Sequence, residues 1–435
     1  MSEVNWPFRR GNTMSIRSAQ GVYLETSDGQ QILDAAGGAI VSNIGHGRER
    51  VVEAVAKATR DYSYVVPPWL TPSRQALADV LSEHWLPPEL SRIHITSGGS
   101  EAVESGIKLA LQYHAAGGER DRSLILARVP SYHGTTLATA GLSGHAARKR
   151  GLESALTVFP SAPTPYLLRC PLGRYHPDAG EYYAQALRQA IIDAGPNRIA
   201  ALLAEPITGS SGGALVPPDD YWPKVREICN EYGVLIIMDE VMTGFGRTGS
   251  RFGYQHWPFV PDILVSGKGL AGGYAPLGGV YASEAIGQAI DQSPFNVMFH
   301  TFGAHPAACA AAAEVLTIID EEQLVERAAQ QGKQLAEKLD ARLRPLPWVA
   351  EVRGRGLLQA VEVVSDPDSL QPFPESADIA NRIVARALDH GVFYYGGGTG
   401  EFRDMVCMGP AFTVQDEHLD TMAEVLAQSI EEVCG

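Results

Sequence analysis

Two ionisable residues each follow a short apolar run near the middle of this 435-residue chain. Asp239 closes the run over residues 234–238, and Lys268 follows the run over residues 263–265 after a Ser-Gly pair. A short continuous apolar run is typical of a strand buried on both faces of a parallel sheet. Ligands of open α/β sheets bind beyond the carboxyl ends of the strands, so both side chains are predicted to reach one ligand site.

A carboxylate and an amine at neighbouring strand ends suit one cofactor chemistry well. The lysine can bind an aldehyde covalently, and the carboxylate can pair with a protonated ring nitrogen. Those are the two protein groups that pyridoxal phosphate requires. Each residue also has an ordinary explanation, because Lys268 could be a solvated loop side chain and Asp239 could close a turn. The interpretation therefore depends on what else reaches the same edge.

A third apolar run leads into a turn suited to an anion. Residues 92–96 are predicted as a strand, the turn is Ser97-Gly98-Gly99-Ser100, and residues 101–114 are predicted as a helix. The free N–H groups and partial positive charge of a helix N-terminus attract phosphate, and glycines allow close approach. A Gly-rich turn before a helix is common and is weak evidence by itself. Gly99 and Ser100 are candidate phosphate-binding residues because other strands that carry functional side chains are predicted to end beside them.

Two more predicted strands end in residues that could contact the same ligand. The strand over residues 124–129 leads to Tyr132 and His133, and an aromatic ring there can stack on a planar ligand or simply pack. The strand over residues 199–204 ends at Glu205. We therefore expect one edge of one sheet to carry a phosphate-binding turn, an aromatic ring that can stack on a ligand, two carboxylates and a lysine.

The elements that must position these residues follow from hydrophobic periodicity. Strands and helices alternate from residue 71 to about residue 320, which predicts a large doubly wound, mostly parallel sheet. Thr71 is the expected N-cap of the first helix, with Pro72 in its first turn. Two later helices of this part are predicted over residues 221–232 and 306–319.

The two ends of the chain are predicted to form a smaller α+β domain. The expected parts are residues 1–70, 71–320 and 321–435. At the N-terminal end we expect a hairpin over 22–34, a Gly-rich loop over 37–47 and a helix over 48–61. At the C-terminal end we expect helices over 324–343, 377–390 and 419–433, a strand pair over 348–364 and a Pro-rich loop over 366–375.

Composition excludes several classes of protein. The formal net charge of −15 and the absence of Lys/Arg runs argue against a nucleic-acid-binding surface. No apolar run has the length of a membrane span, and the polar first residues lack a secretory signal. The five cysteines are scattered without a C-x-x-C pair, so we expect neither a metal site nor a disulfide framework. A cytoplasmic protein is the expectation.

Over nearly its whole length the chain resembles the class III aminotransferases, pyridoxal-phosphate enzymes of fold type I. Their phosphate-binding turn is similar to residues 96–102 (Thr-Ser-Gly-Gly-Ser-Glu-Ala), and their ring-stacking motif to Tyr132-His133-Gly134. The most specific match is Asp239-Glu240-Val241 followed by Gly-Phe-Gly-Arg-Thr-Gly over residues 244–249. Lys268 stands at the spacing of the family's Schiff-base lysine. Further matches are Thr301, His305-Pro306 and residues 353–357.

This resemblance implies a role for each matching residue. Lys268 would hold the cofactor and then serve as general base, and Asp239 would keep the ring nitrogen protonated. Tyr132 and Val241 would sandwich the ring. The phosphate would be bound by Gly99, Ser100 and Thr301 of the partner subunit, and His133 and Glu205 are further expected cofactor contacts. A homodimer, or a dimer of dimers, is therefore expected, with no metal.

The implied reaction moves an amino group from a primary amine or ω-amino acid to a 2-oxo acid, pyruvate or 2-oxoglutarate, by a ping-pong mechanism. Ser210 stands where ornithine- and 4-aminobutyrate-type members carry a second glutamate, which disfavours those substrates. Ile40 stands where amine:pyruvate-type members often have a tryptophan, which would leave space beside the cofactor. Arg403 is the nearest candidate for the substrate carboxylate. Arg355 is the next.

Alternatives share some of these features. Racemases, aminomutases and decarboxylases on the same scaffold carry the same motifs, and only a transaminase stops at pyridoxamine phosphate when given an amine donor alone. A P-loop nucleotide-binding protein is disfavoured, because Gly267-Lys268-Gly269 lacks the following Ser/Thr and the preceding glycine frame. A non-catalytic dimeric scaffold would be colourless when purified. The sequence leaves the donor and the acceptor open.

Overall fold

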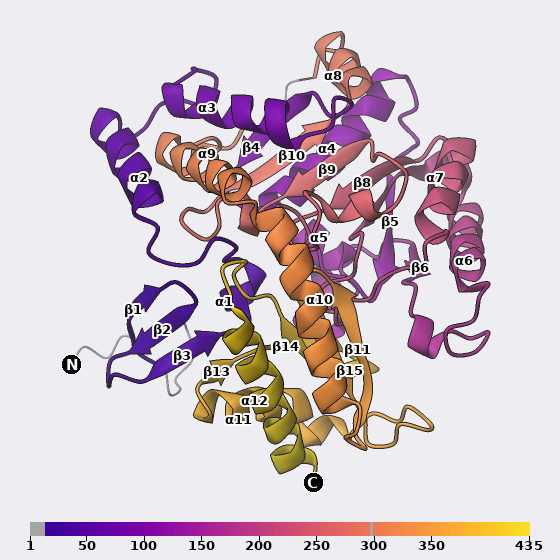
Figure 1. Cartoon of the computed structure of the whole chain (residues 1–435). Helices are drawn as coiled ribbons and strands as arrows, with labels where there is room; N and C mark the ends of the chain where they lie inside the picture. The colour runs from indigo at the N-terminus through magenta and orange to yellow at the C-terminus, as the bar shows by residue number, and fades with distance from the viewer. Residues whose placement is uncertain (1–13, 296–298) are drawn as a thin grey trace.

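The computed structural model describes residues 14–295 and 299–435, and a seven-stranded sheet lies at its centre (Figure 1). The strand order is β4-β10-β9-β8-β7-β5-β6. Strands β5–β6, β5–β7, β7–β8 and β8–β9 pair in parallel, whereas β10 is antiparallel to both of its neighbours. The strands are β4 (Arg92–Thr96), β5 (Leu124–Val129), β6 (Ser161–Pro163), β7 (Ile199–Ala204), β8 (Leu235–Asp239), β9 (Ile263–Ser266) and β10 (Gly278–Ala282).

The direction of β10 decides which strand ends meet. Because β10 is antiparallel to both β9 and β4, those two strands run the same way. Every strand of the sheet except β10 therefore ends at one edge. The predicted large, mostly parallel sheet is confirmed, and the antiparallel strand β10 is an addition that the sequence pattern did not predict.

Both faces of the sheet are buried under helices. In β8, Ile236 and Met238 belong to the same hydrophobic core as Trp222, which lies in α7 (Tyr221–Tyr232). Ile237, between them, belongs to a second core with Ile107 of α4 (Gly99–Ala116). Successive side chains of a strand point to opposite faces, so this division explains why the strands read as continuous apolar runs. Further helices of this part are α5 (Leu137–Leu142), α6 (Ala179–Ala194) and α8 (Glu284–Asp291).

The N-terminal elements join the two ends of the chain. Strands β1 (Ile16–Gln20), β2 (Tyr23–Thr26) and β3 (Gln31–Asp34) form an antiparallel meander, which confirms the predicted hairpin. β3 also pairs in parallel with β13 (Val392–Phe393), near the other end of the sequence. This pairing agrees with the expectation that both ends build one smaller domain, although the domain boundaries themselves stay a prediction.

Three helices follow the meander. The predicted Gly-rich loop contains a short helical turn, α1 (Gly37–Ile40), with non-helical backbone at Gly38 and Ala39. α2 (Glu49–Asp61) packs against α9 (Pro306–Glu321). α3 (Pro72–Val80) begins as predicted, since the Thr71 hydroxyl accepts a hydrogen bond from the Arg74 N–H. A π-helical turn, Leu81–Trp85, continues it.

The C-terminal part has the predicted α+β character. α10 spans Leu324–Leu343, as expected, and α11 (Ile379–Asp389) and α12 (Asp416–Cys434) lie within a few residues of their predictions. A four-stranded antiparallel sheet has the order β11-β12-β15-β14. Its strands are β11 (Val349–Arg355), β12 (Leu358–Val363), β14 (Tyr395–Thr399) and β15 (Phe402–Met408). The hairpin of β14 and β15 was not predicted, because Gly396-Gly397-Gly398 interrupts any hydrophobic alternation.

Within the described residues, no helix is both long and apolar enough to cross a membrane.

Candidate active site

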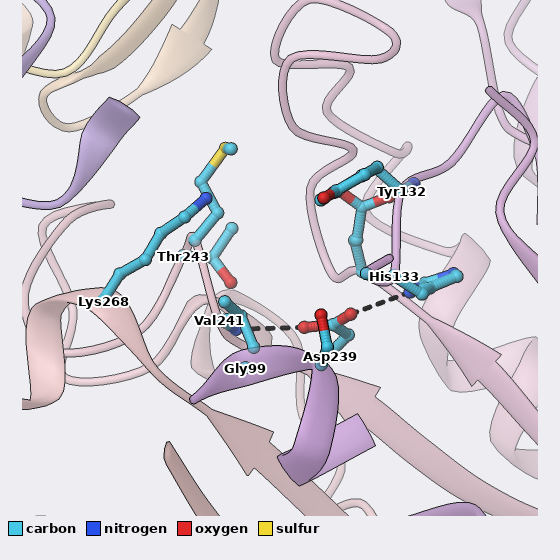
Figure 2. Close-up of a pocket in the computed structure, with 11 residues that line it drawn as sticks. Gly99, Tyr132, His133, Asp239, Val241, Thr243 and Lys268 are labelled. Atoms are coloured by element: carbon cyan, nitrogen blue, oxygen red, sulfur yellow. Dashed lines mark hydrogen bonds and ion pairs between the residues drawn. The ribbon is translucent and has the colours of Figure 1, made fainter. Parts of the chain in front are cut away.

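A cavity of about 190 Å³ lies at the edge where the parallel strands end (Figure 2). In the view of Figure 2, Lys268 stands on the left and Tyr132 on the right, and Asp239 lies below Tyr132, next to His133. Its walls contain all the predicted site residues except Ile40, Thr301 and Arg403. The lining residues are Gly99, Ser100, Tyr132, His133, Gly134, Glu205, Asp239, Val241, Met242, Thr243 and Lys268.

Asp239, the last residue of β8, is buried and held by two hydrogen bonds. One carboxylate oxygen is 2.7 Å from His133 Nδ1, and the other accepts from the Val241 N–H at 3.1 Å. A carboxylate only accepts, so His133 donates from Nδ1. His133 is itself positioned by its backbone N–H, which donates to the Ser143 hydroxyl at 2.8 Å. The result is a fixed negative charge at the base of the pocket.

Lys268 lies just beyond β9, in a single 3-10 turn spanning Lys268–Leu270. Its φ of 37° is in the left-handed region, which non-glycine residues seldom adopt outside sites that constrain them. Burial lowers the pKa of Lys268 to about 8, and the positive charges of Arg247 and Arg148 act in the same direction. The carboxylates of Asp239 and Glu205 oppose that shift. At neutral pH roughly a tenth of this amine is therefore uncharged, far more than of an ordinary lysine.

Glu205 follows β7 and is buried against the same wall. Its carboxylate accepts hydrogen bonds from the Tyr132 N–H at 3.2 Å and the Gly209 N–H at 2.9 Å. Burial raises its pKa, and the nearby Asp239 charge adds to the rise, while His133 opposes it. Glu205 therefore fixes the backbone on which the Tyr132 ring stands.

The N-terminus of α4 forms an open anion site. The helix begins at Gly99, two residues earlier than predicted, and Gly98 supplies no side-chain cap for its first N–H groups. A Cβ at Gly99 would lie 2.9 Å from Val241 Cγ1, so only glycine allows this approach. The Ser100 hydroxyl accepts from the Thr135 N–H at 3.1 Å. An anion placed here would meet both the free N–H groups and the helix dipole.

Three predicted residues lie outside the cavity wall. Thr301 is exposed on a turn just before α9. Ile40 is buried, and the backbone of Gly409 lies directly against it. The Arg403 guanidinium donates to the Phe373 carbonyl at 2.6 and 3.1 Å and to the Gly400 carbonyl at 3.1 Å. The roles proposed for these residues stay predictions.

Two lining residues, Met242 and Thr243, were not named from the sequence, and both directly follow Val241. The third lining residue outside the predicted set, Gly134, belongs to the motif that begins at Tyr132. The Thr243 hydroxyl donates to the buried Glu240 carboxylate at 2.5 Å. Extending the motif Asp239-Glu240-Val241 by two positions would have found Met242 and Thr243.

These groups together fit pyridoxal phosphate. The pocket contains an uncapped helix N-terminus that could bind a phosphate and the aromatic side chain of Tyr132, which could stack on a planar ring. Asp239 offers a buried carboxylate for a protonated ring nitrogen, and Lys268 a partly uncharged amine for an aldehyde. No group of His, Cys, Asp and Glu side chains in the described parts of the chain could hold a metal ion.

Comparisons with known proteins agree with this chemistry. The family model described as "Aminotransferase class-III" matches residues 8–430. Putrescine–pyruvate aminotransferase of Pseudomonas aeruginosa is 34% identical over 367 residues, which cover 83% of this chain and 79% of that protein. Taurine–pyruvate aminotransferase of Rhodobacter capsulatus is 33% identical over 434 residues, covering 97% and 92%. The solved PLP-bound amine transaminase of an uncultivated Pseudomonas species superimposes with a TM-score of 0.92 at 33% identity, covering 100% and 99%.

Proposed function

The chain belongs to the class III aminotransferases, pyridoxal-phosphate-dependent enzymes of fold type I, and from that premise we propose that it moves an amino group from a primary amine or ω-amino acid to a 2-oxo acid such as pyruvate or 2-oxoglutarate. The observation that carries the proposal is the meeting of Lys268 and Asp239 in one pocket. Two similar enzymes are named for pyruvate and for donors with a terminal amine, putrescine and taurine. Those names support the substrate class.

Each part of the cofactor has residues in the pocket that would hold it. Asp239, fixed by His133, would bind the ring nitrogen, and Tyr132 and Val241 would cover the two faces of the ring. Gly99 and Ser100 would bind the phosphate together with Thr301 of the partner subunit. Glu205 would support the ring face through the backbone of Tyr132. When bound, the cofactor supplies a sink for the electron pair left on the substrate carbon.

Lys268 has two tasks in this reaction. Its amine would hold the cofactor aldehyde, and the same amine, once free, would act as the base that takes the proton from the substrate carbon and passes it on. Both tasks need an uncharged amine. The lowered pKa of Lys268, about 8, provides that form near physiological pH. Asp239 would keep the ring nitrogen protonated throughout, since an adjacent negative charge favours the charged form of the ring.

A racemase, aminomutase or decarboxylase is the weaker reading, because the family and the similar enzymes are aminotransferases. A panel of amine donors, each given without acceptor, separates the two. A transaminase converts the bound cofactor stoichiometrically to pyridoxamine phosphate, and pyruvate or 2-oxoglutarate then restores the aldehyde absorbance. Lys268→Ala should lose both this cycle and the borohydride-reducible bond to the cofactor. If every donor leaves the cofactor as the aldehyde while product forms, transamination is excluded.

We also infer that a second copy of the chain completes the site. Trp69 and Leu70 are each 69% exposed, and Phe302, next to Thr301, is 61% exposed. The Arg74 guanidinium ties the two segments together by donating to the carbonyls of Val66 and Ala304. Soluble monomers seldom leave an apolar surface of this kind uncovered. A homodimer, or a dimer of dimers, would cover it and bring Thr301 to the neighbouring phosphate site.

We also propose that the protein is cytoplasmic. All five cysteines are free thiols and four of them are buried, which suits a reducing cytoplasm.

A further inference from the structure

A 2-oxo acid brings a carboxylate into the pocket, and that carboxylate needs a cation. Among the residues that line the cavity, Lys268 is the one lysine or arginine, and it is committed to the cofactor. The two arginines predicted from the sequence are engaged elsewhere. Arg403 donates to backbone carbonyls, and Arg355 lies 3.5 Å from Asp219 with its guanidinium 5.5 Å from the centre of the Trp257 ring.

Arg148 is differently placed. It ends the 3-10 turn Ala146–Arg148, which follows α5. Its guanidinium carbon lies 4.9 Å from the centre of the Tyr132 ring, the aromatic wall of the pocket. The one side-chain hydrogen bond of Arg148 among the described residues is a long one, 3.4 Å to the Tyr395 hydroxyl of β14. No carboxylate in the described chain pairs with it, so its charge is free to meet an incoming anion.

The charge of Arg148 also acts inside the site. It contributes to the lowered pKa of Lys268, although burial is the larger cause. It likewise helps to lower the pKa of His145 to about 4, again after burial. His145 stands edge-on to Tyr132 with ring centres 6.3 Å apart, and its buried Nδ1 has no hydrogen-bond partner. At neutral pH His145 is thus uncharged, and Arg148 is the cation of this cluster.

We propose that Arg148 binds the carboxylate of the 2-oxo acid acceptor, with the Tyr395 hydroxyl as a second donor. The proposal rests on the aminotransferase function proposed above. A guanidinium presents two parallel N–H groups to a carboxylate, and a charged hydrogen bond of this kind is about twice as strong as a neutral one. The long contact from Arg148 to Tyr395 leaves room for both groups to turn toward an anion.

This assignment also gives the site a way to take two kinds of substrate. An amine donor without a carboxylate leaves Arg148 in its contacts with Tyr132 and Tyr395, where the guanidinium remains stacked on the ring. The carboxylate of a 2-oxo acid would instead bind the Arg148 guanidinium. Because Tyr395 belongs to the C-terminal sheet and Arg148 to the large central part, a bound carboxylate would bridge the two parts over the pocket.

The test separates the two half-reactions in holoenzyme variants Arg148→Ala and Arg148→Lys. Arg150→Ala is the matched control, since Arg150 lies in the same loop but pairs with Glu375 at 2.5 Å. The first half-reaction is followed with butylamine. The second is followed with pyruvate and, as an acceptor of similar size without a carboxylate, with propanal.

Arg148→Ala should raise the KM for pyruvate on the order of 10- to 100-fold, as expected for loss of a charged hydrogen bond. Its rates with butylamine and propanal should stay within about twofold of wild type, and Arg148→Lys should fall between. The affinity for propanoate, measured by titration calorimetry, should fall in parallel with the pyruvate effect. Arg150→Ala should match the wild type throughout.

Two results would overturn the assignment. An unchanged pyruvate KM and propanoate affinity in Arg148→Ala would place the carboxylate elsewhere. Equal losses with pyruvate, propanal and butylamine would mean that Arg148 only supports the Tyr132 ring. A wild-type enzyme that never transfers an amino group to any 2-oxo acid would instead refute the proposed function, and the propanoate titration would still report on Arg148.

Discussion

Replacing Asp239 by asparagine keeps the shape of the side chain but removes its negative charge, which we propose pairs with the protonated ring nitrogen of the cofactor. The Val241 N–H can still donate to the asparagine oxygen, and His133 can still bond to the amide by changing tautomer. The fold should therefore survive. What is lost is the attraction between a carboxylate and a protonated ring, which amounts to about 4 kcal/mol for charges 4 Å apart at an effective dielectric constant of 20.

At about 1.36 kcal/mol for each factor of ten, Asp239→Asn should slow the proton-transfer step roughly 1,000-fold. The assay is a single-turnover half-reaction with butylamine, followed by loss of the aldehyde absorbance, with cofactor content measured separately after alkaline release. Glu240→Gln is the matched control, because Glu240 is a buried carboxylate one residue along whose hydrogen bonds go to Thr243 and to the N–H groups of Gly253 and Tyr254.

Glu240→Gln should lower stability more than it lowers the chemical rate. Burial raises the pKa of Glu240 to about 7, so this side chain is already partly protonated at neutral pH, and its substitution by glutamine removes less charge than Asp239→Asn does. If Asp239→Asn keeps its cofactor and reacts within tenfold of wild type, another group holds the ring nitrogen and the reasoning fails.

The other predictions concern Lys268, the phosphate site and the subunit interface. Cofactor attachment requires an uncharged Lys268, whose pKa is lowered to about 8. The rate of attachment to the cofactor-free enzyme should therefore rise with pH and reach a plateau above about pH 8. A rate that does not change between pH 6 and 9 would contradict this. Gly99→Ala places a Cβ 2.9 Å from Val241 Cγ1, and the displaced helix end should weaken cofactor binding about 10- to 100-fold in an equilibrium titration. Unaltered binding would mean that the helix end does not hold the phosphate. Mixing inactive Lys268→Ala and Thr301→Ala chains should restore part of the activity, since each mixed dimer would have one site without either lesion. Failure to recover activity in confirmed mixed dimers would rule out a shared site.

Local chemistry and strand direction made the centre of the site predictable. Lys268, Asp239, Glu205 and Tyr132 are far apart in sequence, yet each follows an apolar run that is buried on both sides in the structure. Parallel strands in one sheet must end at the same edge, so residues at their ends had to meet. The cap at Thr71 and the bounds of α10 were equally local, because they depend on a side chain's own helix.

Elements without a strong hydrophobic period were missed. β10 begins Gly278-Gly279, and the hairpin of β14 and β15 contains three successive glycines, so neither shows a pattern that favours a strand. β10 pairs with β4, and β15 pairs with β12, so backbone pairing with strands distant in sequence supports both elements. Propensity is a weak guide where partners supply the stabilisation.

The sequence by itself determined the family, the order of the main elements and the identity of the residues at the strand ends, because each of these depends on residue type and short-range spacing. Only the tertiary structure decided where the long side chains go. Arg403, the candidate from the sequence, donates to backbone carbonyls, whereas Arg148 lies over Tyr132 and has no carboxylate partner among the described residues. An arginine's partners come from several segments of the chain, so its contacts depend on the fold and not on its neighbours in sequence.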